Sequence, residues 1–468
     1  MKKILVILAL LATSAWAEDD FFAGFGRADI TPPMGTPMPG YFHKRHAKEV
    51  FDPLYVMCIA LAGGGQTGLV FTVDNCMVTK AAGERLRAAV VKATGVPEHM
   101  LFVNSTHTHT GGSVWTSKGN TDEENDLCGF YSRLVEMRAA DAALFAIADL
   151  KPSKLSVGRG VCKGISFIRR YRMKDGSVKT NPGIDNPQID HPLGAPDESV
   201  QVVRFRRGDV GDIAIINFGT HPDTVGFERI SADWPGVTRR VFEHVLSNRT
   251  RCMVLNGAQG DTNHHDPHPS AERKALVRGR GDGTPVHYYM GRKLAGVALQ
   301  VWDDCRDVPA GPVRGEMRRL EAPTNLTTEQ EKEWLALYDA GKTNDIPLGH
   351  MELNALVDPG HRARRWQNGG PAAISLPLTV LAIGDSVAFA GFPGEPFTQI
   401  GLDVKAKSPF PMTLVSCLVN GANGYFPSTE AFSQGGYEAI STEYARGNGD
   451  LLVQTSVDML NGLWNKRD

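Results

Sequence analysis

The sequence predicts an α/β fold (mixed α+β) built as one large domain. Three observations support this prediction. Short apolar runs rich in β-branched residues end in turn residues, as strands do. Segments with helical character lie between these runs, and such alternation is typical of α/β proteins. There is no internal repeat, no low-complexity stretch and no linker rich in Pro, Gly or Ser, so one body is favoured even though 468 residues would suffice for roughly two to four domains.

The predicted strands are short and mainly apolar, and each ends at a residue type that favours turns. Their brevity separates them from helices, which usually need about ten or more residues. In chain order they are 54–62, 67–73, 101–104, 200–205, 212–218, 253–256, 376–392 and 413–420.

The predicted helices fill the longer segments between the strands. The last of them is expected to carry a capping box, with Thr327 as the N-cap and Gln330 closing the box. In chain order they are 81–93, 130–148, 235–246, 288–304 and 328–340.

Composition excludes several classes of protein. Hydrophobic residues make up 42% of the chain and the 50 basic and 52 acidic residues nearly cancel, which argues against intrinsic disorder. A formal net charge of −2 does not suggest a nucleic-acid-binding protein. Bulk charge therefore points to no macromolecular partner, and we expect a small-molecule substrate.

The first 17 residues have the pattern of a cleavable signal peptide. Lys2 and Lys3 precede an apolar run at 4–11, and Ala15-Trp16-Ala17 fits the cleavage site. The run is too short for a membrane span of about 20 residues, and charges interrupt every later apolar run. We expect a periplasmic or secreted protein whose mature domain comprises residues 18–468.

Seven cysteines would meet an oxidising environment at that destination. They include no C-x-x-C pair, which argues against a thiolate zinc cluster or a dense disulfide framework. One or two disulfides, or buried free thiols, both remain consistent with the sequence.

Two histidine motifs follow predicted strands directly. His107 and His109 come after the run at 101–103, and alternate residues of an extended segment point to the same side. His221 follows the strand at 213–218, with Asp223 near enough to orient its ring. Imidazole is a common zinc ligand, although each motif alone could also be an ordinary histidine at a strand end.

Two further strand ends carry other ligand types. Glu395 follows the run at 387–392 and could be an oxygen ligand, a general base or an acidic residue in the first turn of a helix. Tyr425 follows the strand at 413–420 after a glycine-containing segment. With His107 and His221, these residues would form a site of nitrogen and oxygen ligands open to water, as in catalytic rather than structural zinc sites.

The polar segment at 261–268 also follows a predicted strand. It could line the site, hold a second metal ion or be a solvated loop, because His and Asp suit divalent ions. We predict contacts with the substrate from Asp261, Asn263 and His265.

The motifs resemble those of the neutral (non-lysosomal) ceramidases and occur in the same order. The most specific match is the segment 425–438, in which two tyrosines twelve apart are followed by a glutamate. The resemblance spans roughly residues 24 to 444 and also includes the segment 26–33, the two histidine motifs and Pro393-Gly394-Glu395.

This resemblance implies roles for the matching residues. The zinc ligands would be His107, His221, Glu395 and Tyr425. His109 and Tyr437 would lie beside the substrate carbonyl, and a family arginine corresponds to Arg169 or Arg170, of which we select Arg169.

Two departures from the family affect the substrate. Asn263 stands where the family's Gly-Asp-x-Ser-Pro-Asn segment has its serine, and the chain is shorter than members with an immunoglobulin-like C-terminal domain. We therefore expect a zinc-dependent hydrolase that cleaves an amide of an N-acyl, lipid-like substrate. The alternatives are a zinc hydrolase for a non-lipid amide or ester, such as an acylated sugar, and a metal-dependent binding protein without turnover.

Overall fold

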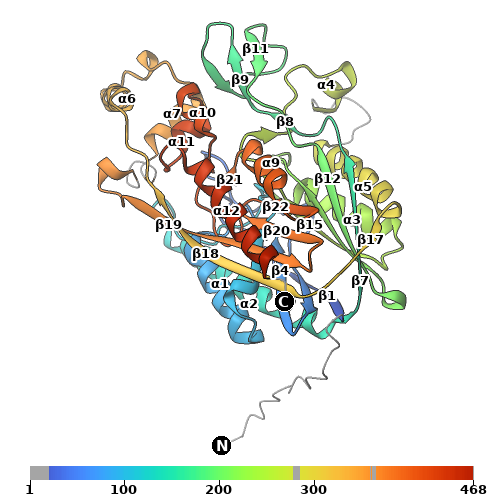
Figure 1. Cartoon of the computed structure of the whole chain (residues 1–468). Helices are drawn as coiled ribbons and strands as arrows, with labels where there is room; N and C mark the ends of the chain where they lie inside the picture. Colours follow the sequence, from blue (N-terminus) through green and yellow to red (C-terminus); the bar gives the residue numbers. More distant parts are fainter. Residues whose placement is uncertain (1–19, 278–284, 359, 361–364, 467–468) are drawn as a thin grey trace, which may run out of the picture.

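The computed structural model describes residues 20–277, 285–358, 360 and 365–466 (Figure 1). The predicted signal peptide at 1–17 lies outside these residues. Within them, no helix combines the length and the apolar character needed to cross a membrane. The described chain forms three main sheets with helices on their outer faces, which confirms the predicted mixed α/β fold.

The N-terminal sheet has the strand order β5-β4-β3-β1-β6, and α1 (Lys80–Thr94) and α2 (Asp122–Ala148) cover it. Gly24 and Gly26 of β1 let α2 approach closely, because a Cβ at Gly26 would lie 2.0 Å from the carbonyl oxygen of Ala142. The strands are β1 (Phe21–Asp29), β3 (Tyr55–Gly63), β4 (Gln66–Val73), β5 (Leu101–Ser105) and β6 (Lys151–Pro152).

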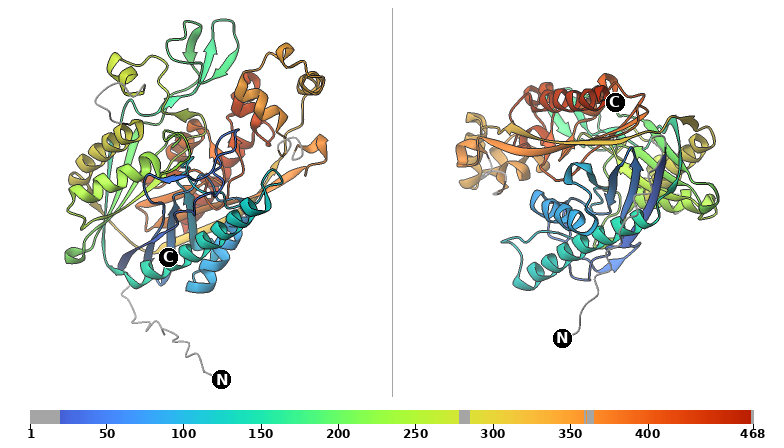
Figure 2. Two further views of the ribbon diagram at one scale, coloured as in Figure 1. Left: turned by 180° about the vertical axis from the view of Figure 1, so that it is seen from behind. Right: turned by 60° about the horizontal axis from the view of Figure 1, so that its bottom comes forward.

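The middle sheet has the order β15-β13-β12-β7-β17, in which β13 and β15 are parallel. Helices α3 (Asp233–Val245) and α5 (Val286–Asp303) pack on its outer face, side by side in the left view of Figure 2. The strands are β7 (Lys154–Val161), β12 (Ser199–Arg206), β13 (Ile213–Phe218), β15 (Arg251–Asn256) and β17 (Arg306–Val308).

The C-terminal sheet has the order β18-β19-β20-β22, and β20 and β22 are parallel. Helices α9 (Thr398–Lys407) and α12 (Asn448–Asn465) cover its outer face. In the right view of Figure 2, α12, this sheet, the N-terminal sheet and α1 with α2 follow one another as layers. The strands are β18 (Val313–Pro323), β19 (Ala373–Ile383), β20 (Val387–Gly391) and β22 (Met412–Ser416).

Alternation along the strands divides the core into connected apolar clusters. In β13, Ile213 and Ile215 face the central cluster shared by all three sheets, while Ala214 and Ile216 face α3 and α5. The same alternation separates Phe389 of β20, which joins the central cluster, from its neighbours that pack toward α9 and α12. Burial on both faces explains why these strands are continuous apolar runs rather than alternating ones.

Short ladders hold the loops between the sheets. Strand β21 (Glu395–Pro396) pairs in parallel with β23 (Tyr425–Phe426), and β8 (Phe167–Ile168) pairs with β16 (Thr262–Asn263). A three-stranded sheet, β10-β9-β11, projects beside β8 and α4 at the top of Figure 1. Its strands are β9 (Arg170–Met173), β10 (Val178–Thr180) and β11 (Ile189–Pro192), and α4 is Ala271–Val277.

Four further α-helices and one pair of short strands in the described part of the chain lie outside the three main sheets. Short helices between β18 and β19 and before α12 stand at one side of the body. They are α6 (Glu329–Asp339), α7 (His350–Val357), α10 (Thr429–Gln434) and α11 (Tyr437–Ser441), and a further two-stranded pair joins β2 (Glu49–Val50) to β14 (Arg229–Ile230).

Three element predictions needed correction. The run at 376–392 is two strands, β19 and β20, because Gly384 at φ +50° begins a turn that reverses the chain. Helix α2 begins at Asp122 rather than 130, where Thr121 and Glu124 form a capping box. The capping box of α6 lies one residue later than predicted, with Thr328 and Glu331 in place of Thr327 and Gln330.

The cysteines are free thiols. All seven lie in the described part of the chain, none of them forms a disulfide there, and only Cys305 is not fully buried. The sequence was consistent with either disulfides or buried free thiols. The structure shows free thiols, most of them buried among other side chains as small hydrophobic residues.

Candidate metal centre

The four predicted metal ligands come together where strands of different sheets end. His107 follows β5 and His221 follows β13, while Glu395 and Tyr425 are paired residues of the β21–β23 ladder. The isolated bridge between Asn104 and Val419 joins β5 to the segment after β22, which draws the N-terminal and C-terminal sheets together at this point.

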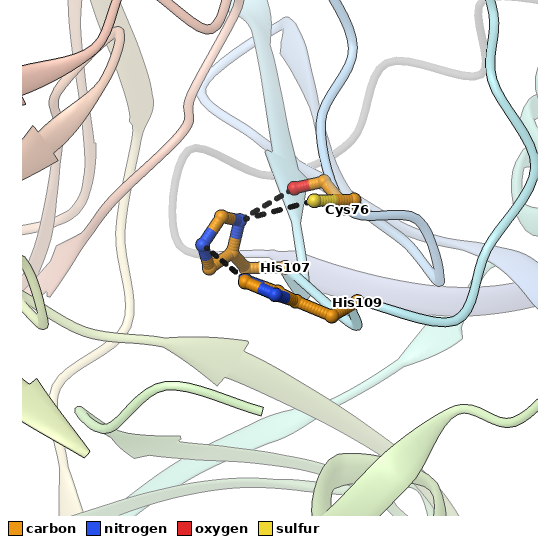
Figure 3. Close-up of side chains that lie close together, drawn as sticks. All are labelled: Cys76, His107 and His109. Carbon is orange, nitrogen blue, oxygen red and sulfur yellow. Dashed lines mark hydrogen bonds between the residues drawn. The ribbon is translucent and has the colours of Figure 1, made fainter. Parts of the chain in front are cut away.

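The backbone fixes the ring of His107. Its φ of +71° is rare outside glycine and is held by a bond from its own N–H to the carbonyl of Asn75 at 2.9 Å. Nδ1 donates to the carbonyl oxygen of Cys76 at 2.7 Å, and the Cys76 Sγ lies 3.9 Å from the same nitrogen (Figure 3). Because Nδ1 is engaged, Nε2 is the atom turned to the site.

The ring of His221 is held in the same way. Nδ1 lies 3.0 Å from the carbonyl oxygen of Gln259 and 2.9 Å from that of Thr262, and it must donate because a carbonyl only accepts. Asp223, which we expected to orient this ring, instead accepts from Nδ1 of His264 at 2.8 Å. Two backbone carbonyls already occupy the position that the carboxylate would have taken.

One oxygen of Glu395 lies close to the Nε2 atoms of both histidines. Its Oε2 lies 3.3 Å from Nε2 of His107 and 3.1 Å from Nε2 of His221, and Gln259 donates to the same oxygen at 3.2 Å. Burial would raise the pKa of this carboxyl, but the charge of His107 and a hydrogen bond with it hold that pKa well below its usual range. The site therefore contains a buried carboxylate.

Tyr425 and Tyr437 close another side of the site. Their rings lie 5.5 Å apart in an edge-to-face arrangement, and the Arg169 guanidinium carbon lies 5.3 Å and 5.8 Å from the two ring centres. Burial raises the pKa of Tyr437 to about 12, so its hydroxyl keeps its proton at neutral pH.

The structure distinguishes Arg169 from Arg170. Arg169 donates to Oε1 of Glu438 at 2.6 Å and to the carbonyl of Gly260 at 2.8 Å, and its Nη1 lies 3.3 Å from Nε2 of His221. Because a guanidinium only donates, that imidazole nitrogen presents a lone pair. Arg169 lines the cavity, whereas Arg170 is not among its lining residues and donates to the carbonyl of Gly435.

His109 lies beside the three converging groups. Its Nε2 is 3.2 Å from Nε2 of His107, and the edge-to-face ring of Tyr41 is 5.2 Å away. Nδ1 is buried and finds no hydrogen-bond partner among the described residues. Burial first, and then the charge of His107, lower the pKa of His109 well below its usual range, so the ring is neutral.

A cavity of about 610 Å³ opens onto these groups. Sequence reasoning missed several of its walls, because Tyr41, Phe42, Met77 and Met351 give no chemical signal as isolated apolar residues. Within the polar segment 261–268 it did not select His264, because the role of this residue depends on a contact with Asp223 from a distant loop.

The three predicted substrate residues lie in different places. His265 lines the cavity. Asn263 is fully buried behind it and donates from Nδ2 to Oδ1 of Asn181, which does line the cavity. Asp261 is not a wall residue, because its Oδ1 accepts from the backbone N–H and the hydroxyl of Thr398, both at 2.7 Å. Its carboxylate secures the start of α9.

We therefore expect Asp261→Ala to act on stability. Loss of a side chain that binds the first turn of a helix costs about 0.5–2 kcal/mol. Urea unfolding should show this decrease in the free energy of unfolding, while metal content stays that of the unmodified protein. A variant that is as stable as the unmodified protein but has lost turnover would contradict this expectation and support a contact between Asp261 and the substrate.

The residues fit a catalytic zinc site. Two imidazole nitrogens and a carboxylate oxygen from different elements lie within 4.8 Å of one another, all three residues are buried, and the backbone directs both imidazoles inward. A second group of candidate donors, Cys76, His107 and His109, competes for the same histidine. In that second group, Nδ1 of His107, the atom next to the Cys76 sulfur, already donates to a carbonyl. The group of His107, His221 and Glu395 is therefore the better fit to zinc.

The fold is similar to that of ceramidases. A solved neutral ceramidase from Pseudomonas aeruginosa aligns with a TM-score of 0.71 and 17% identity over 96% of this chain and 75% of that chain. A ceramidase solved in complex with C2 aligns with a TM-score of 0.71 and 18% identity over 96% and 76%. No protein-family model and no curated protein matches the sequence. At this identity the likeness establishes the fold alone. It confirms that the chain has the fold expected from the resemblance of its motifs to those of neutral ceramidases.

Proposed function

We propose that the chain is a zinc-dependent hydrolase that cleaves the amide bond of an N-acyl substrate. The observation that carries this proposal is the convergence of His107 Nε2, His221 Nε2 and Glu395 Oε2 at the wall of a cavity. The ceramidase fold of the solved neighbours supports an amide as the bond that is cleaved.

His107, His221, Glu395 and Tyr425 would hold the metal. When bound, zinc acts as a Lewis acid that polarises a carbonyl and makes water more acidic near neutral pH. Glu395 balances part of the positive charge with its carboxylate, and Gln259 keeps that carboxylate turned toward the two histidines. The carbonyls of Cys76, Gln259 and Thr262 keep both imidazoles in the tautomer that presents Nε2.

The remaining polar groups would act on the substrate. The Tyr437 hydroxyl can donate a hydrogen bond to the oxygen of the amide carbonyl as negative charge develops there. The neutral His109 ring can hold a proton at Nδ1 or Nε2 and pass it to the departing amine. Arg169 positions both tyrosines through its contacts with their rings, and Glu438 fixes the guanidinium.

Metal analysis with a substrate panel tests this proposal. The purified protein should contain one zinc per chain, lose turnover when treated with a chelator and regain it when zinc is restored. The panel should pair ceramide with an N-acyl amino sugar and a simple acyl ester. Stoichiometric zinc without turnover of any of these would favour a metal-dependent binding protein. Full activity after complete metal removal would contradict the proposal.

A further inference from the structure

A smaller cavity adjoins the main one and takes no part in the chemistry described above. It is a partly open space of about 170 Å³, and Asn181 and His265 line both cavities. Its other walls include Tyr171, Pro182, Ile184 and Asp266. The two shared residues place the smaller cavity directly beside the one at the metal centre.

Two separate segments build this smaller cavity. One wall comes from Tyr171 of β9 and the residues that follow β10, and the other comes from the loop after β16. The Asp185 N–H donates to the carbonyl of Pro267 at 2.8 Å, and the Asp185 carboxylate pairs with Lys274 at 2.7 Å. These bonds tie the two walls together, so the cavity is a fixed part of the fold.

The walls combine flat apolar faces with a few polar groups. Tyr171, Pro182 and Ile184 offer surfaces on which the face of a small ring can pack. Asn181 accepts from Asn263 with Oδ1, which leaves Nδ2 as the end that can donate to a ligand. Asp266 uses Oδ1 to accept from the His268 N–H at 2.9 Å, which leaves Oδ2 to accept from a hydroxyl.

Charge and volume narrow the class of ligand. Among the residues that line the smaller cavity, Asp266 carries a negative charge and none is Lys or Arg, so a phosphate or carboxylate head group would be repelled there. A volume of about 170 Å³ is below the 300–1,000 Å³ usual for drug-sized ligands, which suits a single ring better than a long alkyl chain. Apolar residues such as Phe42, Met77 and Met351 line only the larger cavity, where an acyl chain can lie.

We infer that the smaller cavity is a head-group subsite for a neutral, hydroxylated ring such as a pyranose, attached to the amine side of the amide. This inference rests on the proposed amide hydrolysis. The reaction would add water across the C–N bond and release a carboxylic acid and an amino sugar. The acyl chain would remain in the larger cavity.

Direct binding tests the subsite without turnover. Calorimetry on the full chain should compare N-acetylglucosamine with N-cyclohexylacetamide, which has a ring of similar size but no hydroxyls. We expect at least about tenfold tighter binding of the sugar, and Asp266→Asn and His265→Ala should weaken it by about 5- to 100-fold. The exposed His268→Ala, in the same loop, is the matched control and should bind as the unmodified protein does. Equal affinity for both ligands, or variants that weaken both equally, would overturn the inference.

Hydrolysis distinguishes failure of the subsite from failure of the proposed reaction. The two substrates are N-octanoylglucosamine and N-octanoylcyclohexylamine, and the measured quantity is the ratio of their kcat/KM values. The subsite predicts a ratio above about ten that falls in Asp266→Asn. A ratio near one with measurable turnover would refute the subsite and leave the hydrolase intact. Sugar binding without turnover of either substrate would refute the hydrolase and leave the subsite intact.

Discussion

His107→Ala and Glu395→Gln should each abolish zinc binding and reduce turnover to background. Each change removes one of three donor atoms that lie within 4.8 Å of one another. Loss of a group that merely orients a metal ligand weakens metal binding by about 10- to 100-fold, and loss of a ligand itself should exceed that range. Zinc content measured by atomic spectroscopy and kcat/KM on the substrate identified by the panel are the two readouts.

The two substitutions remove different amounts of side-chain volume, so comparing them separates loss of a metal ligand from loss of packing. Glu395→Gln keeps the size of the side chain, so it changes the charge and the donor atom while the packing stays similar. His107→Ala opens space beside Cys76, and its thermal unfolding should be recorded to establish that the protein is folded. The exposed His244→Ala on α3 is the histidine control and should keep both zinc and turnover. Retention of stoichiometric zinc by both site variants would refute the assignment of the ligands.

The two proposed histidine ligands could be selected from the sequence because their signals are local. His107 and His221 each follow a buried strand within a few residues, and the ends of strands that have parallel neighbours are where sites form in α/β proteins. The two strands belong to different sheets, so their meeting could not be read from either motif. Glu395 had three interpretations because its neighbours alone fit a helix start as well. The β21–β23 ladder excludes the helix interpretation, since it places Glu395 in a strand opposite Tyr425 and before α9.

Other residues could not be assigned from local sequence. Arg169 and Arg170 are adjacent, and neighbours in an extended segment point to opposite sides, so only the surrounding chain decides which one faces the cavity. Asp261 was assigned to the substrate because it is polar and follows a strand. Its partner Thr398 is 137 residues away, and no local pattern could have revealed that contact.

The same limitation explains the pair formed by Asp223 and His264. Both residues drew attention in the sequence, but as parts of separate motifs 41 residues apart. Asp223 was expected to orient His221, a role that backbone carbonyls fill instead. Sequence patterns identified the chemically capable residues well, whereas their pairing depended on how loops from different sheets meet.

His109→Ala and Tyr437→Phe should reduce turnover strongly while zinc remains bound. Neither side chain belongs to the donor set of His107, His221 and Glu395, although His109 lies only 3.2 Å from His107. Loss of a proton-transfer group costs about 10²- to 10⁴-fold in rate, and loss of one donor to a developing oxyanion costs about 10²- to 10³-fold. We therefore expect kcat to fall in these ranges, with one zinc per chain in both variants.

Metal content decides whether His109 is a metal ligand or a group that acts on the substrate. If His109 and Cys76 shared the metal with His107, His109→Ala would lose zinc as His107→Ala does. Cys76→Ser provides the complementary test, because it changes that second donor group and leaves the carbonyl that holds His107 in place. Retained zinc in His109→Ala and Cys76→Ser, together with a loss of kcat confined to His109→Ala, would establish His109 as a group that acts on substrate. Loss of zinc from either variant would indicate that Cys76, His107 and His109 bind the metal, rather than the group that contains Glu395.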